Sequence, residues 1–137
     1  MTFSQVFLLL AIVPLSTALL GIGRSQGVSV SGKLVCNGKP AAGVKLKLYE
    51  KEAILDSLME ESQSDASGMF HLSGKKTEIS TIDPKLNIYH KCEYSGPCYQ
   101  KIGITIPDSH VNSGETYDVG TLNLANEYTG SNTDCLN

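Results

Sequence analysis

The sequence has no tryptophan and a single arginine, Arg24, among its 137 residues. Acidic residues slightly outnumber basic ones, 14 against 11, which gives a net charge of −3 at pH 7. Nucleic-acid-binding domains are expected to carry clustered basic charge, and single strands also require aromatic rings on which bases stack. The scarcity of both features argues against nucleic acid as a partner.

The sequence also lacks any Asn-X-Ser/Thr acceptor site, so N-glycosylation is not expected. No Lys or Arg precedes Arg24, and residues 6–20 form an uncharged apolar run, VFLLLAIVPLSTALL. A bilayer-spanning helix needs about 20 apolar residues, whereas this run is shorter and is interrupted by Pro14. Residues 1–23 are therefore predicted to be a secretory signal peptide cleaved after Gly23, although its start has no basic residue. We expect a secreted, extracellular chain that is not an integral membrane protein after cleavage.

The remaining sequence alternates apolar and polar residues with a period of two, which is typical of strands with one buried face. The alternation covers residues 28–36, 44–48, 70–72, 86–92, 102–106 and 122–124. Asn, Asp, Gly and Pro separate these segments, as turns require. Residues 51–64 are ambiguous, and we favour a strand over 56–62 rather than a helix. The pattern predicts one all-β domain over residues 27–137, a two-sheet sandwich of about seven strands.

Four cysteines follow the signal peptide: Cys36, Cys92, Cys98 and Cys135. An even number in a small exported domain indicates two disulfides. Because only five residues separate Cys92 from Cys98, we expect these two to pair, leaving Cys36 for Cys135; swapped pairing stays open. Zinc binding by His90, Cys92 and Cys98 is disfavoured because the spacing matches no zinc motif. We expect no metal and no cofactor, and a buried His90 on the core-facing side of its strand.

Several sequence blocks resemble the transthyretin-like family of nematodes. They are residues 32–44, 65–70, 82–92, Cys98, 106–107, 117–122 and 134–136. The resemblance covers the whole chain after the signal peptide. It implies a secreted protein with a prealbumin-like fold, that is, an immunoglobulin-like Greek-key sandwich. It also implies an extracellular binding role, such as bridging between exposed phospholipid on a cell surface and a receptor.

A related branch of this fold hydrolyses 5-hydroxyisourate, using histidines, a central arginine and a C-terminal Tyr-Arg-Gly-Ser. Here residues 128–131 read Tyr-Thr-Gly-Ser, and Arg24 lies outside the expected domain. A guanidinium group is well suited to clamp a planar anionic substrate through paired hydrogen bonds. Without it we do not expect this reaction. We identify no other catalytic constellation in the sequence, so we expect no enzymatic activity and assign no catalytic residue.

An aromatic cluster at the Cys92–Cys98 loop is the candidate recognition element. Tyr89, Tyr94 and Tyr99 flank this loop, together with Lys91, and aromatic residues are enriched at protein interfaces. Lys45 and Lys47 are expected on the outer side of a sheet, where they form either a polar surface or a contact for anionic headgroups. We expect an extracellular receptor or an anionic phospholipid surface as partner, with carriage of a small apolar ligand as the alternative.

Overall fold

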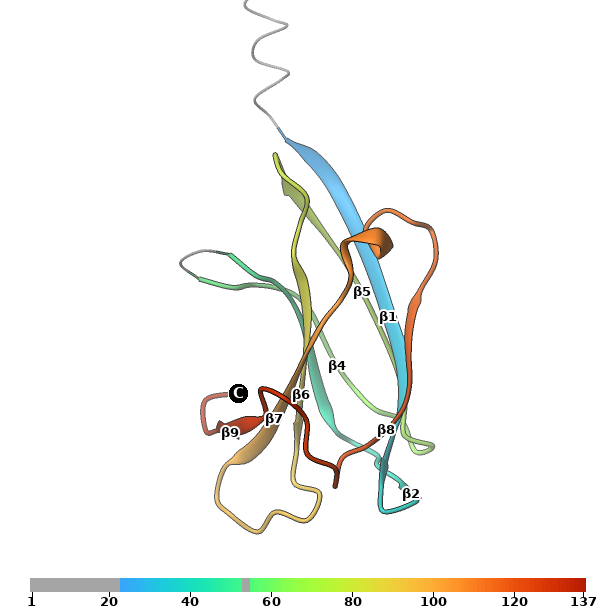
Figure 1. Ribbon diagram of the computed structural model, residues 1–137, viewed down its shortest axis with the longest axis vertical. Coiled ribbons are helices and arrows are strands. Elements are labelled where there is room, and N and C mark those ends of the chain that lie inside the picture. The colour runs from blue at the N-terminus through green and yellow to red at the C-terminus, as the bar shows by residue number, and fades with distance from the viewer. Residues whose placement is uncertain (1–22, 53–54) are drawn as a thin grey trace, which may run out of the picture.

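The computed structural model describes residues 23–52 and 55–137, which form two β-sheets packed face to face (Figure 1). The first sheet contains β1 (Arg24–Cys36), β2 (Lys39–Pro40), β5 (Met69–Glu78) and β8 (Tyr117–Asn123). The second contains β3 (Lys45–Glu50), β4 (Ser57–Gln63), β6 (Pro84–His90), β7 (Tyr99–Thr105) and β9 (Asn132–Asp134). A single 3₁₀ turn, η1 (Asp108–His110), lies between β7 and β8.

β1 is the central strand of the first sheet. It pairs antiparallel with β5 along most of its length, from Arg24 opposite Glu78 to Lys33 opposite Met69. On its other edge it pairs in parallel with β8, and its end turns back into β2. The prediction of an all-β, two-sheet sandwich is therefore confirmed, and the seven expected segments correspond to the seven longer strands.

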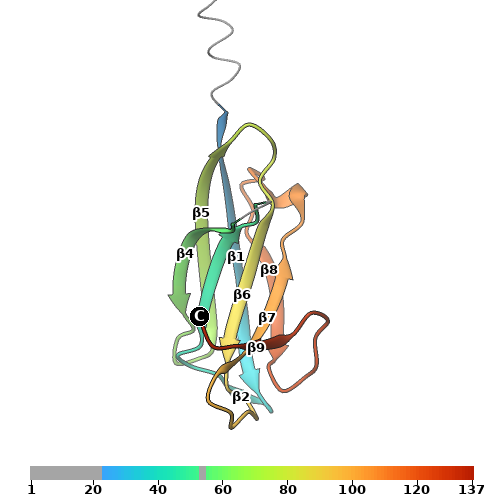
Figure 2. The same cartoon turned by 90° about the vertical axis from the view of Figure 1, so that its left-hand side faces the viewer.

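The second sheet has the order β4-β3-β6-β7-β9 and is antiparallel throughout. The ambiguous segment after residue 50 forms β4, an edge strand, in agreement with the favoured strand over 56–62. β9 was not expected from the sequence, because its residues are polar and show no alternation. Figure 2 views this sheet from outside and shows the C-terminal segment crossing in front of it.

The core lies between the sheets and consists of the alternating apolar side chains. Their spacing puts every second residue of a strand on the same face, and burial follows that spacing closely in β1 and β3. The fully buried members, each at most 2 % exposed, are Val30, Leu34, Leu46, Leu48, Leu72, Ile82, Leu86, Ile88, Ile102 and Ile106.

Gly32 interrupts the core-facing row of β1 for a steric reason. A Cβ atom at this position would lie 2.6 Å from Val119 Cγ2 and 2.8 Å from Phe70 Cζ. The Phe70 ring therefore occupies the space that a side chain at position 32 would need. The core is close-packed here, so glycine is required.

The predicted signal peptide lies almost entirely outside the described residues and stays a prediction. In residues 23–52 and 55–137, no helix has the length and apolar character needed to cross a membrane.

Candidate functional site

Two disulfides meet at the loop between β6 and β7. Cys36 is bonded to Cys92, with Cα atoms 5.8 Å apart, and Cys98 is bonded to Cys135, with Cα atoms 4.6 Å apart. All four cysteines are thus paired, as expected, but the expected pairing of Cys92 with Cys98 and of Cys36 with Cys135 is wrong.

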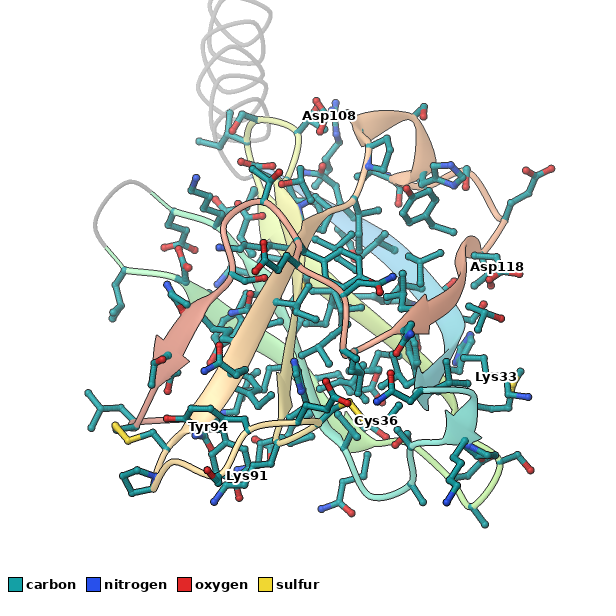
Figure 3. The ribbon with its side chains drawn as sticks, turned by 60° about the horizontal axis from the view of Figure 1, so that its bottom comes forward. Lys33, Cys36, Lys91, Tyr94, Asp108 and Asp118 are labelled. Carbon is teal, nitrogen blue, oxygen red and sulfur yellow. A yellow bond between two sulfur atoms is a disulfide. The ribbon has the colours of Figure 1, made fainter. Side chains whose placement is uncertain are left out.

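The strand arrangement explains the observed pairing. Cys36 ends β1 and Cys92 follows β6, so the first bond joins the two sheets at one end of the sandwich (Figure 3). Tyr99 of β7 is in register with Asp134 of β9, which makes Cys98 and Cys135 the next opposed pair. The short sequence distance between Cys92 and Cys98 suggested that these two pair with each other. Strand register instead brings each of them next to a cysteine that is far away in the sequence.

The residue after each cysteine of the inter-sheet disulfide adopts a left-handed backbone conformation. Asn37 has φ of 52° and Glu93 has φ of 50°. This conformation is unfavourable for non-glycine residues, although less so for Asn. The Asn37 side-chain amide donates a hydrogen bond to the Glu93 carboxylate, so the two turns are also linked outside the disulfide.

Lys91 and Tyr99 form the exposed part of the predicted recognition element. The Lys91 ammonium lies 4.9 Å from the centroid of the Tyr99 ring, a cation–π arrangement. Tyr99 is 36 % exposed and Lys91 is also exposed. The structure therefore brings two of the four predicted contact residues, Lys91 and Tyr99, together at the surface. Figure 3 labels Lys91 on this loop.

The other two predicted contact residues lie elsewhere. Tyr89 is only 4 % exposed, so it is not available as part of an open aromatic cluster. It lies on the outer side of the second sheet, and Lys47 Nζ is 5.5 Å from its ring centroid. Tyr94 is half-buried and covers Gly96, where an added Cβ would lie 2.4 Å from Tyr94 Cζ.

A pocket of about 450 Å³ lies beside the loop and is lined in part by His90, Tyr94 and Tyr128. His90 is buried, as predicted, and its Nδ1 accepts a hydrogen bond from the Cys92 backbone N–H at 3.0 Å. Burial lowers the pKa of His90 below its ordinary value of 6.5. His90 is therefore neutral at pH 7, with its proton on Nε2, and both cysteines of the zinc alternative are held in disulfides.

An acidic cluster at the far end of β3 has a structural explanation. Glu50, Glu52 and Glu78 have carboxylate oxygens within 4.8 Å of one another. Glu50 accepts a hydrogen bond from the Asp83 backbone N–H at 2.6 Å, and Glu52 pairs with Lys76 at 3.5 Å. These contacts join β3 to neighbouring segments. They do not indicate a ligand for the cluster.

The three histidines lie on separate parts of the fold. His71 is exposed on β5, His90 ends β6, and His110 lies in η1 against Tyr117. Arg24 begins β1. The structure therefore adds no support for a hydrolase site, and the expectation that the chain is not an enzyme stays a prediction.

The fold and the loop define a small β-sandwich with two disulfides. The sequence model of the Transthyretin-like family matches residues 31–107. Transthyretin-like protein 5 of Caenorhabditis elegans is 45% identical over 139 residues, covering 96% of this chain and 99% of that protein. Transthyretin-like protein 2 of the same organism is 41% identical, covering 85% of this chain and 86% of that protein. The chain belongs to the transthyretin-like family, as its sequence blocks predicted.

Transthyretin-like protein 33 of C. elegans is also 41% identical, over 82% of this chain and 83% of its own length. Among solved structures, a 9R-lipoxygenase from Cyanothece PCC8801 aligns with a TM-score of 0.48 and 20% identity. That alignment covers 72% of this chain and 16% of the lipoxygenase, and it has no bearing on function. Family membership supports a binding-type protein and identifies no specific ligand.

Proposed function

We propose that the protein is secreted and acts outside the cell as a binding protein. It contacts an anionic phospholipid surface or a receptor through the β6–β7 loop. The observation that carries this proposal is the double anchoring of the loop. Cys92 ties one end to the first sheet, and Cys98 ties the other end to the C-terminal segment. A loop held in this way loses little conformational entropy on binding.

The exposed chemistry of the loop suits such a contact. Lys91 forms no ion pair within the described residues and retains its positive charge for an anionic partner. Tyr99 offers an amphipathic ring, which is favoured where apolar and wet surroundings meet. A lysine near an anionic membrane contributes about 1 kcal/mol, which corresponds to about fivefold in affinity.

Co-sedimentation with vesicles containing phosphatidylserine tests the phospholipid contact, with phosphatidylcholine vesicles and a second salt concentration alongside. Lys91→Gln should weaken sedimentation about fivefold at low salt. Lys75→Gln is the matched control, because Lys75 is exposed on β5 opposite Gly27, away from the loop.

Binding of the labelled protein to intact cells tests the receptor contact. Lys91→Gln and Tyr99→Ala should both reduce binding, whereas Lys75→Gln should not. Unchanged binding of both loop variants to vesicles and to cells would show that the loop is not the recognition element.

Carriage of a small apolar ligand remains the alternative prediction. Three pockets in residues 23–52 and 55–137 are open to solvent and have polar side chains in their walls. No feature of the described core favours this alternative over the loop.

A further inference from the structure

The outer face of the second sheet carries lysines arranged around a hollow. Directly opposed residues on antiparallel strands point to the same side of a sheet. The register of β3, β6 and β7 therefore forms three rows on this face: Lys45–Tyr89–Lys101, Lys47–Asn87–Gly103 and Tyr49–Lys85–Thr105. Neighbouring rows are about 7 Å apart along the strands, because each row is two residues further on.

The hollow on this face has a volume of about 440 Å³, and its walls include Lys47, Tyr89 and Lys101. Gly103 lies outside these walls. A Cβ atom at Gly103 would lie 2.8 Å from Lys85 Cε and 3.4 Å from Lys85 Nζ, so the Lys85 side chain covers the glycine.

Asn87 forms the floor of the hollow and has an unused acceptor. Its side chain is only 6 % exposed, yet Oδ1 is buried with no hydrogen-bond partner among the described residues. Its Nδ2 makes a single long hydrogen bond, 3.4 Å, to Tyr89 Oη. Buried polar atoms are nearly always paired, so this oxygen is available to accept a hydrogen bond from a ligand.

Two partly buried lysines supply positive charge beside that acceptor. The Lys47 side chain is 14% exposed, and its ammonium is 3.9 Å from Glu61. The Lys101 side chain is 24% exposed, and its ammonium is 3.6 Å from Asp134. Both ion pairs are close to the distance limit for a salt bridge, so each ammonium can still donate to an oxyanion at shorter range. Burial also raises the pKa of Tyr89 to about 12, which keeps its hydroxyl protonated.

The shape of the site excludes a flat surface as its ligand. The C-terminal segment crosses this face (Figure 2), and Lys45 Nζ contacts Asn137 Oδ1 at 3.4 Å. Asp134, Leu136 and Asn137 therefore form one wall of the hollow. A planar bilayer cannot reach groups below that wall, and a bare sulfate ion has no proton to donate to Asn87.

We propose that the hollow binds an anionic saccharide. A sulfate or carboxylate group lies between Lys47 and Lys101, and a ring hydroxyl donates a hydrogen bond to Asn87 Oδ1. The sugar ring packs against Tyr49, which is partly exposed and lines the hollow. This site is separate from the β6–β7 loop, so the two proposals are tested independently.

Titration with a heparin-derived tetrasaccharide tests the proposal. Binding is measured by calorimetry and by NMR of the ¹⁵N-labelled protein with both disulfides formed. The side-chain amide signal of Asn87 should shift on binding. Lys47→Gln should fold, since it removes only one long ion pair, to the partly exposed Glu61. It removes one of the two ammonium groups that line the hollow, and it should weaken binding by at least about tenfold.

Lys75→Gln is the matched control, because it removes the charge of an exposed lysine on β5, in the other sheet. It should leave the affinity unchanged, as should Thr105→Val, since Thr105 lies on the same face but outside the hollow. Inorganic sulfate and a desulfated tetrasaccharide should each bind much more weakly than the sulfated sugar. Absence of binding by the unmodified protein, equal affinity of Lys47→Gln, or equal affinity for sulfate alone would overturn the proposal.

Discussion

Cys36 at the end of β1 is bonded to Cys92 just beyond β6, and this bond joins the two sheets across the sandwich. The Asn37 side chain reinforces the connection by donating a hydrogen bond to Glu93. The disulfide therefore fixes the position of the β6–β7 loop relative to the first sheet.

Non-reducing peptide mapping should recover Cys36 linked to Cys92 and Cys98 linked to Cys135. No Lys or Arg lies between Cys92 and Cys98, so trypsin leaves both in one peptide. A second protease that cleaves after Glu93 or Tyr94 separates them. A crosslink between Cys92 and Cys98, or between Cys36 and Cys135, would contradict the structure.

Removal of the inter-sheet disulfide should cost more stability than removal of the other. Cys36 and Cys92 are 56 residues apart, and the chain-entropy model predicts a loss of about 4 kcal/mol for Cys36→Ala/Cys92→Ala. Cys98–Cys135 anchors only the short edge strand β9, which can detach without unfolding the sandwich. Urea unfolding of the two double variants tests this order, and equal losses would argue against it.

Glu50→Gln should stabilise the protein at pH 7. Burial raises the pKa of Glu50 above its ordinary value of 4.5; the hydrogen bond from the Asp83 N–H opposes this rise, and repulsion from Glu78 and Asp83 adds to it. Because the folded-state pKa is raised, the contribution of Glu50 to stability is present below pH 4.5 and is lost as the pH rises through the folded-state pKa. Glutamine can still accept the hydrogen bond from the Asp83 N–H, so we expect a higher free energy of unfolding for the variant at pH 7.

The comparison of unfolding free energies at pH 4 and pH 7 checks the assignment. The gain from Glu50→Gln should shrink at the lower pH, where Glu50 itself is protonated. A variant that is less stable than the original at both pH values would show that the Glu50 charge contributes favourably to the fold.

Gly68→Ala should destabilise the turn between β4 and β5 strongly. Gly68 has φ of 82°, and an added Cβ would lie 2.2 Å from the Leu34 carbonyl oxygen. Gly38→Ala is the matched control, because Gly38 has φ of 85° and an added Cβ would meet nothing within 4 Å. Backbone strain alone should cost about 1–2 kcal/mol at Gly38, and Gly68 should cost clearly more in thermal unfolding. Equal losses would show that the Leu34 contact is unimportant.

The strand assignments were predictable because their physical cause is local. Alternating residues such as Leu46 and Leu48 must point to one face of any strand that contains them, so the pattern alone indicates which face is buried. β9 had no such pattern, since Asn132–Asp134 is polar and is held only by pairing with β7 and by the adjacent disulfide. The candidate site was predicted in part: the sequence indicated the loop and its Lys91 and Tyr99. It did not indicate that Tyr89 is buried beside Lys47.

By itself, the sequence determined the fold class, the family, the core-facing residues and the participation of all four cysteines in disulfides. These properties depend on residue type and short-range spacing. Only the tertiary structure decided which cysteines pair and which side chains surround Asn87. Both depend on strand order and register, which place residues far apart in the chain, such as Cys36 and Cys92, within bonding distance.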